Sequence, residues 1–243
     1  MAIVDVQYQT LAPHEAMGLL EKANVRVVPM HLMSCDDSEE WFDEKHITFP
    51  VAVKIAARFI AHKAKVGGVW LGCQTPEQVL RARESVLSAA ARSLDDARAR
   101  QLREAGVYVQ SMRHGDLEVV LSVKRDPAFG PLVGFGLGGW AIELWKDVAL
   151  RRPPLNPRDI EALLNTTRAG ALIASNDRFA SALHDIRTAM AGIGQLALEM
   201  DGQLGELEAN PLIVGSDGAF AVDALGSALM RSPSSDQEGF AQR

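Results

Sequence analysis

Oxygen-bearing side chains recur near the end of the chain, in the stretch GELEANPLIVGSDGAFAVDAL (205–225). Glu206, Glu208 and Asn210 are spaced two residues apart, so on a strand their side chains share one face. The turn SDG predicts a return strand that brings Asp223 back towards Asn210. Hard oxygen ligands that converge on two strands suit Mg²⁺, which takes few protein ligands. The alternative interpretation is the solvated polar face of an ordinary hairpin.

Lys54 interrupts the apolar run FPVAVKIA (49–56). A buried ammonium without a partner is costly, so this side chain either reaches solvent at the sheet edge or faces an anion in a cleft. The glycine-rich stretches 67–68 and 135–139 permit close backbone approach and offer amide donors for phosphate, although such stretches are usually turns. Amides, a lysine and a divalent ion are together the parts of a nucleotide-phosphate site.

The segment AHKAKVGG (61–68) concentrates His62, Lys63 and Lys65 beside the glycine pair. One interpretation is a solvated turn. The other is a mobile loop that handles phosphate, because a neutral imidazole nitrogen is nucleophilic near pH 7. The loop alone does not decide between them.

Helices and strands alternate without the strict βαβ rhythm of a doubly wound sheet. Thr75 and Asn156 are predicted helix N-caps, each followed by a proline. The middle and end of the chain read as long antiparallel strands, so we expect an α+β fold. We expect a small first lobe over 10–110, a larger second lobe over 111–226 and a loose polar tail over 227–243. The expected helices cover 12–25, 36–46, 75–94, 156–167 and 176–200, and the expected strands lie within 25–32, 49–56, 68–73, 105–112, 116–126, 129–139 and 205–225.

Composition narrows the class of protein. The chain of 243 residues has a formal charge of −6, which argues against a general nucleic-acid-binding surface. Its two cysteines, Cys35 and Cys73, lack metal-ligand spacing and favour a reduced, cytoplasmic setting. No apolar run is long enough for a membrane span.

Four stretches resemble the ATP-grasp β subunit of ADP-forming acyl-CoA synthetases (acetate–CoA ligase, ADP-forming), relatives of succinyl-CoA synthetase. They are PVAVKIAARFIAHKAKVGGVWLG, KRDPAFGPLVGFGLGG, ELWKDVALRRPPL and GELEANPLIVGSDGAFAVDA, and they follow the family's order over about residues 10–226. The resemblance implies an ATP-grasp fold, in which two α+β subdomains close on ATP or ADP.

The same resemblance assigns roles to individual residues. It implies that His62 relays phosphoryl between the nucleotide and a histidine of a CoA-binding α subunit, with Lys63 balancing the charge. It implies that Mg²⁺ is held by Glu208, Asn210 and Asp223, with the latter two as the direct ligands. The implied nucleotide contacts are Lys54, Gly67, Gly68, Val69, Val109, Gln110, Met112 and Glu118.

The implied activity is acid + CoA + ATP ⇌ acyl-CoA + ADP + phosphate, in a hetero-oligomer with the α subunit. The chain departs from the family pattern at Ala64 and Lys65, where the family has Ser and Asp, and at Ser111, where it has an acid. It also has Arg58 before the histidine loop and lacks the usual Gly-x-Arg-Gly near 172–179. These departures motivate a second hypothesis, a degenerate module that binds a nucleotide or a partner without catalysis. A third, an ATP-grasp carboxylate–amine ligase acting alone, is disfavoured because such enzymes carry a further N-terminal domain.

Overall fold

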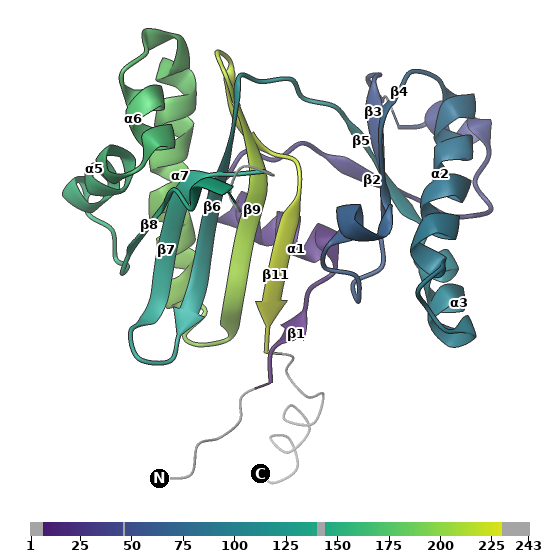
Figure 1. The fold of residues 1–243 in the computed structure, drawn as a ribbon, viewed down its shortest axis with the longest axis horizontal. Coiled ribbons are helices and arrows are strands. Elements are labelled where there is room, and N and C mark those ends of the chain that lie inside the picture. The colour runs from purple at the N-terminus through teal and green to yellow at the C-terminus, as the bar shows by residue number, and fades with distance from the viewer. Residues whose placement is uncertain (1–6, 46, 140–143, 230–243) are drawn as a thin grey trace, which may run out of the picture.

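The computed structural model describes residues 7–45, 47–139 and 144–229, which form two lobes built on separate sheets (Figure 1). The first lobe has a four-stranded sheet in the order β2-β5-β3-β4, and the second has a seven-stranded sheet in the order β1-β11-β9-β6-β7-β8, with β10 paired to β9. Every strand pair in both sheets is antiparallel. The α+β expectation is therefore confirmed.

The first lobe is built around the four-stranded sheet and has its own hydrophobic core. Its helices α2 and α3 lie on the outer side of that sheet (Figure 1). Its core is lined by the apolar faces of β3, β5 and α2, with Val53, Ile55 and Val109 fully buried. Its elements are β2 (Met30–Met33), β3 (Val51–Ile55), β4 (Val69–Cys73), β5 (Val107–Ser111), α2 (Pro76–Ala91), α3 (Asp96–Ala105) and the short 3₁₀ helices η1 (Glu39–Phe42) and η2 (Lys63–Val66).

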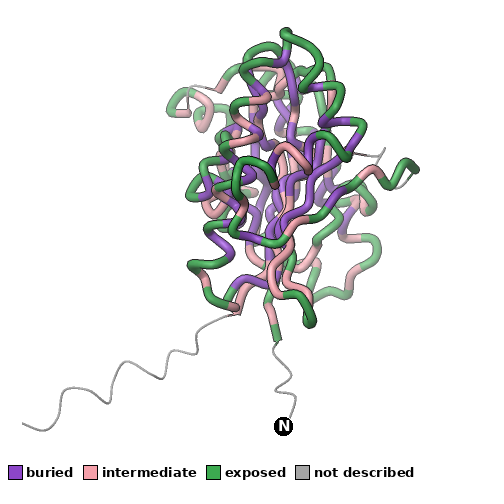
Figure 2. The backbone as a smooth tube through the Cα atoms, turned by 90° about the vertical axis from the view of Figure 1, so that its left-hand side faces the viewer, coloured by how far each residue is buried: buried purple, intermediate pink, exposed green. Residues whose placement is uncertain are grey.

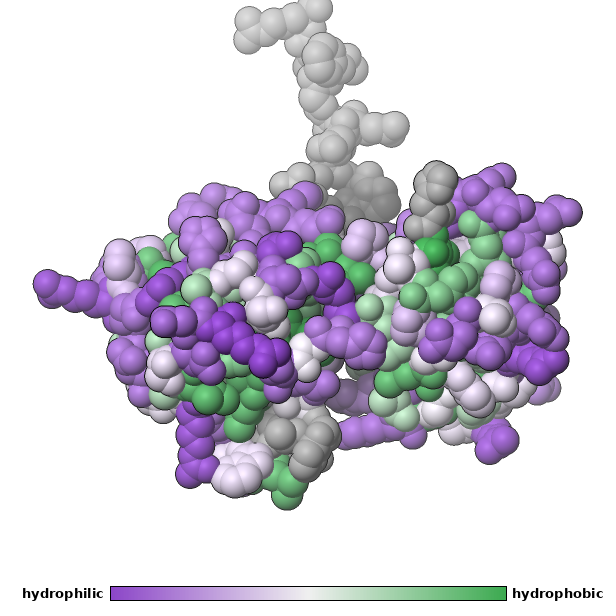
Figure 3. Space-filling view, turned by 90° about the horizontal axis from the view of Figure 1, so that it is seen from above, coloured by the Kyte–Doolittle hydropathy of each residue, from purple (hydrophilic) through white to green (hydrophobic). Residues whose placement is uncertain are grey.

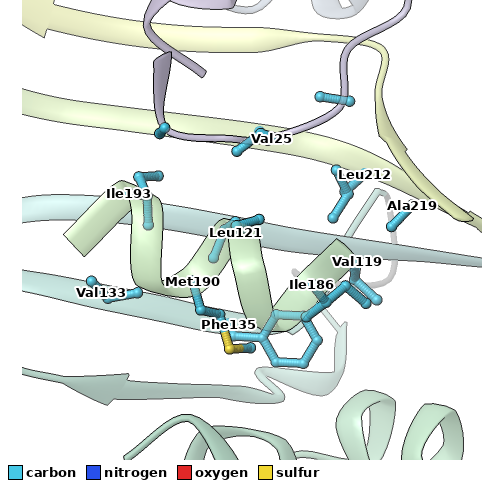
Figure 4. Close-up of a cluster of buried hydrophobic side chains, with 14 of the residues drawn as sticks. Val25, Val119, Leu121, Val133, Phe135, Ile186, Met190, Ile193, Leu212 and Ala219 are labelled. Carbon is cyan, nitrogen blue, oxygen red and sulfur yellow. The ribbon is translucent and has the colours of Figure 1, made fainter. Parts of the chain in front are cut away.

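The second lobe packs helices against one face of its large sheet. Phe135 and Leu121 from the sheet meet Ile186, Met190 and their neighbours from the long helix α7 (Figure 4). Its elements are β1 (Gln9–Thr10), α1 (Pro13–Lys22), β6 (Leu117–Asp126), β7 (Gly130–Leu137), β8 (Val148–Arg151), α5 (Pro157–Thr166), α6 (Arg168–Ala174), η3 (Asp177–Phe179), α7 (Ala180–Glu199), β9 (Leu204–Gly215), β10 (Gly218–Ala221) and β11 (Ala224–Ala228).

The expected lobe boundaries need one correction. The boundary near residue 110 agrees with β5 and β6 lying in different sheets, but residues 16–25 do not belong to the first lobe. Ala16, Met17 and Leu20 of α1 are buried in the second lobe's core, because the apolar face of this helix packs on β9 and β11. The part of the expected tail from residue 230 lies outside the described residues, and 227–228 belong to β11.

The predicted helix N-caps are found in the structure. Thr75 and Asn156 cap α2 and α5 through their side-chain oxygens. The expected helix at 36–46 is only the short η1, and α3 was not predicted. Helix α3 buries a single residue, Leu102, so it lacks the apolar period on which a sequence prediction depends.

Burial follows the two sheets, while the connections between elements lie at the surface (Figure 2). From above, polar and apolar side chains alternate over both lobes (Figure 3). None of the described helices combines the length and apolar character that a membrane span needs. The cytoplasmic location stays a prediction.

Candidate functional site

A cavity of about 750 Å³ lies between the two lobes. Its walls come from β3, η2, β4 and the end of β5 in the first lobe, and from β9 and the segment joining β10 to β11 in the second. Ten of the expected site residues line it: Lys54, His62, Lys63, Val69, Gln110, Met112, Glu118, Glu208, Asn210 and Asp223. Residues separated by more than 160 positions in the sequence therefore meet in one space.

Lys54 extends from β3 across the gap between the lobes. Its ammonium donates to the Gln110 side-chain oxygen at 2.7 Å and to the Val222 carbonyl of the second lobe at 2.6 Å. Burial lowers the pKa of Lys54 from 10.5 to about 8, although the nearby Asp223 carboxylate raises it and the Lys63 ammonium lowers it further. Both of the bonds it makes are to neutral acceptors, so burial prevails over the attraction of Asp223.

The local sequence explains why the Val222 carbonyl is available. Val222 lies opposite Pro211, and its N–H donates to the Pro211 carbonyl at 3.3 Å. The reciprocal bond of an antiparallel ladder cannot form, because proline has no N–H. The carbonyl of Val222 instead accepts the Lys54 ammonium. Both β10 and β11 pair with β9, and Pro211 of β9 thus interrupts this pairing at the residues between β10 and β11, where the cavity lies.

Gln110 has a buried side chain that links three parts of the molecule. Its oxygen accepts from Lys54, while its amide nitrogen donates to the Val28 carbonyl at 2.7 Å. Val28 is bound in turn to Ala221 of the second lobe through its own N–H. Gln110 therefore orients Lys54 and joins the lobes, a role that its sequence position did not indicate.

The oxygen donors expected to bind metal lie together on the second lobe. The N–H of Asn210 donates to the carbonyl of Asp223, which confirms the predicted return of the chain. The Asn210 side-chain nitrogen donates to Glu208 at 3.1 Å. Glu206 does not line the cavity and instead lies 3.9 Å from the ammonium of Lys124.

A glycine after β7 holds this group in place. The N–H of Gly139 donates to the Asn210 side-chain oxygen at 2.8 Å. Gly139 has φ of +60°, and a Cβ at this position would collide with the Glu118 carboxylate. The amide of Gly139 is therefore used to position Asn210 and is not free for phosphate, so the phosphate contact expected of the stretch 135–139 stays a prediction.

Lys63 connects the turn η2 to the second lobe. Its ammonium lies 2.9 and 3.1 Å from the two carboxylate oxygens of Asp223, and its side chain is only 6% exposed. His62 immediately precedes this turn, is exposed, and lines the cavity. An exposed imidazole thus lines the cavity next to a lysine whose ammonium is held by Asp223.

Gly67, Gly68 and Val109 do not line the cavity. The amides of both glycines are used inside η2, donating to Ala64 and Lys63 carbonyls, so they are not free for phosphate. A Cβ on Gly68 would collide with Ile55, which accounts for the glycine by packing. Val109 is fully buried in the first lobe's core.

Arg113 also lines the cavity and was missed by the sequence analysis. It follows β5 in the segment that joins the lobes, and its guanidinium pairs with Asp217 and lies 3.7 Å from the centre of the Phe220 ring. A basic residue two positions after the last residue of the strand VYVQS was the available signal.

The donor set fits a magnesium ion. Asp223 already binds a cation, the Lys63 ammonium, on both oxygens, so the position attracts positive charge. Within the described residues, no three His, Cys, Asp or Glu side chains form a metal-binding group. An ion here would take two carboxylates and one amide oxygen, which matches the few protein ligands that Mg²⁺ uses beside phosphate.

Comparison with known proteins adds independent information. The protein-family model described as "ATP-grasp domain" matches residues 3–225. The chain is 31% identical over 218 residues to the acetate–CoA ligase [ADP-forming] I subunit beta of Pyrococcus furiosus, covering 88% of this chain and 90% of that one. It is 28% identical over 220 residues to acetate–CoA ligase [ADP-forming] II of Archaeoglobus fulgidus, covering 88% of this chain but only 30% of that one.

Among solved structures, the chain is similar to acetyl-coenzyme A synthetase 1 of Ca. Korarchaeum cryptofilum, in complex with coenzyme A, Ca-AMPCP and HgCl⁺. The TM-score is 0.78 at 28% sequence identity, over 91% of this chain and 94% of that chain. The likeness therefore extends over both lobes and the cavity between them.

Proposed function

Because the chain belongs to the ATP-grasp family, we propose that it is the nucleotide-binding subunit of an ADP-forming acyl-CoA synthetase. The reaction is acid + CoA + ATP ⇌ acyl-CoA + ADP + phosphate. The observation that carries the proposal is that a first-lobe cation, Lys54, and the second-lobe oxygen donors Asn210 and Asp223 line one cavity between the lobes, with Lys54 bonded to the carbonyl of Val222 next to Asp223. A polyphosphate and its metal need these two partners on opposite walls.

The nucleotide lies in the interlobe cavity in this proposal. Lys54 contributes positive charge, and Val69 and Met112 contribute apolar walls for the base. Glu208, Asn210 and Asp223 would hold Mg²⁺, which when bound neutralises phosphate charge and orients the phosphates. Gln110 keeps Lys54 directed at the cavity through its side-chain oxygen.

His62 is the phosphoryl acceptor in this proposal. Its ring lies on an exposed turn at the cavity wall, where it can receive a phosphoryl group and present it to a second protein. Lys63 supplies positive charge next to it. The size of the relatives supports a partner, since the chain spans 30% of the length of the A. fulgidus relative. That partner is a CoA-binding α subunit, which forms a hetero-oligomer with this chain.

Nucleotide binding tests the proposal directly. Lys54→Met should weaken ADP binding in the presence of Mg²⁺ by about 10- to 100-fold, because a charge-assisted hydrogen bond is worth about 1.5–3 kcal/mol. The matched control is Lys124→Met, which removes a lysine that is 77% exposed and paired only loosely with Glu206. Calorimetry measures both. Equal affinity of wild type and Lys54→Met contradicts the proposed site.

The alternative remains a module that binds a nucleotide or a partner without catalysis. It is motivated by Ser111 and Lys65, the departures from the family pattern, which both line the cavity. Assaying acid, CoA and ATP with and without the CoA-binding partner separates the two. Turnover that requires both chains supports the enzyme, and a stable complex without turnover supports the module.

A further inference from the structure

Arg113 and Phe220 are stacked on each other beside the cavity. Arg113 lies in the segment that joins β5 to β6, and its guanidinium carbon is 3.7 Å from the centre of the Phe220 ring of β10. This separation is that of stacked planes, because a guanidinium pointing edge-on at the ring would hold its carbon farther away. The Phe220 ring therefore covers one face of the guanidinium.

The charge of Arg113 has a partner, whereas that of Lys54 is held by neutral groups. The Arg113 guanidinium donates to the carboxylate of Asp217, in the turn between β9 and β10. The two hydrogen bonds of the Lys54 ammonium go to neutral oxygens. Lys54 is thus the better partner for phosphate, while Arg113 offers a flat and weakly hydrated surface.

Ile213 of β9 connects this stack to the cavity wall. It is paired with Phe220 on one side and with Glu118 on the other, so the three side chains share one face of the sheet. Ile213, Glu118 and Arg113 line the cavity, but Phe220 does not. Since Phe220 covers one face of the guanidinium, we expect the opposite face of Arg113 to be the one turned to the cavity. The Arg113 side chain is 32% exposed, so it is accessible to a ligand.

Apolar side chains lie open next to the guanidinium. Met112 precedes Arg113, and its sulfur accepts the N–H of Gly72, which brings the end of β4 close. Leu71 of β4 lines the cavity with Met112 and is 61% exposed. Arg113 and Ile213 also line a second hollow of about 300 Å³, so there is free space beside them. Exposed apolar side chains beside a flat cation suit a flat heteroaromatic ring.

We propose that the guanidinium of Arg113 stacks on the base of the bound nucleotide and is a determinant of base binding. The inference rests on the proposed function and extends it to a residue to which the sequence assigned no role. Phe220 and Asp217 hold the guanidinium in one plane before the ligand arrives, so less side-chain freedom is lost on binding. Bases stack on arginine planes in the same way in protein–RNA complexes.

The first experiment compares two ligands by calorimetry in the presence of Mg²⁺. ADP has a base, and inorganic pyrophosphate has none. Arg113→Lys keeps the charge but loses the plane, so the affinity for ADP should fall about 3- to 30-fold and that for pyrophosphate should not change. An unchanged affinity for ADP overturns the proposal. Equal losses for both ligands also overturn it, since they would assign Arg113 to the phosphates.

Arg26→Lys is the matched control. The Arg26 guanidinium lies 4.0 Å from the centre of the same Phe220 ring and also bonds to the carbonyl of Asp217, but Arg26 does not line the cavity. Its replacement should leave the affinity for ADP unchanged. If Arg26→Lys and Arg113→Lys weaken ADP binding equally, the stack only supports the β9–β10 turn and the proposal is wrong.

A measurement on the wild-type chain needs no variant to fold. The Nε–H resonance of Arg113 should move upfield when ADP is added, because a proton above an aromatic ring is shielded, and pyrophosphate should not move it in this way. Absence of ADP binding would overturn the nucleotide-binding function and this inference with it. Normal ADP binding with an unmoved Arg113 resonance would overturn the inference alone.

Discussion

At the scale of single residues, Lys54 is the side chain of the site whose charge its surroundings change most. It is a cation on a strand whose neighbours are all buried, and it is bound to two neutral oxygens. Desolvation disfavours its charged form, so its pKa falls to about 8. A ligand with negative phosphates would restore the charged form, and this makes the residue well suited to anion binding.

The lowered pKa predicts how stability depends on pH. Between about pH 8 and 10.5 the unfolded chain keeps a proton that native Lys54 has lost, so the free energy of unfolding rises with pH across this window. The full effect is about 3 kcal/mol. Urea unfolding of wild type and Lys54→Met at pH 7 and pH 10 measures it, because the contribution of the other lysines cancels in the difference. If the free energies of unfolding of wild type and Lys54→Met differ by the same amount at pH 7 and pH 10, the lowered pKa of Lys54 is contradicted.

At the scale of elements, the two ends of β7 show how backbone geometry shapes the cavity. Gly130 at its start and Gly139 after its end both have positive φ, at +74° and +60°. At Gly130 a Cβ would meet nothing within 4 Å, whereas at Gly139 it would meet Glu118. Only the second glycine is required by a contact inside the site.

Alanine substitutions at Gly130 and Gly139 separate the cost of backbone strain at positive φ from the cost of a steric clash of the new Cβ. Gly130→Ala should cost about 1 kcal/mol of stability through its positive φ alone. Gly139→Ala should cost about 1–3 kcal/mol more, and should also weaken nucleotide binding, because it displaces Glu118 and the amide that holds Asn210. Urea unfolding and ADP calorimetry check both effects. If both variants lose the same stability and the same affinity for ADP, the contact of Gly139 with the site residues has no effect and its proposed role is wrong.

At the scale of the whole molecule, polar contacts fix the orientation of the lobes. His14 of α1 and the hydroxyl of Tyr108 on β5 lie 2.7 Å apart, and they come from different lobes. Burial raises the pKa of Tyr108, with smaller contributions from His14, Glu15 and Arg58. Together with the Lys54–Val222 bond, the Gln110–Val28 bond and the Lys63–Asp223 ion pair, this contact holds the two lobes against each other.

A double-mutant cycle measures the His14–Tyr108 contact. Tyr108→Phe and His14→Ala should each destabilise the chain, with a coupling free energy of about 1 kcal/mol, the net worth of a typical hydrogen bond. Tyr8→Phe is a control, since its hydroxyl donates to Gly202 within the second lobe and should not couple to His14. Additive effects of Tyr108→Phe and His14→Ala contradict a stabilising bond between lobes.

The sequence by itself predicted most of the helices and strands, α3 excepted, and most of the expected site residues that line the cavity. Period-two apolar runs predicted the strands, capping residues predicted where α2 and α5 begin, and the spacing of Glu208 and Asn210 put them on one face. These are local properties, governed by side-chain alternation and by hydrogen bonds between residues close in sequence. The return of Asp223 to Asn210 followed from a single short turn.

The tertiary structure decided which distant groups meet. Lys54 binds the Val222 carbonyl 168 residues away, Lys63 binds Asp223, and α1 packs in the second lobe although it precedes the first. Gly67 and Gly68 look like phosphate-binding glycines in the sequence, yet their amides are used inside the turn. Such pairings depend on how two lobes are placed against each other, and local periodicity carries no information about that placement.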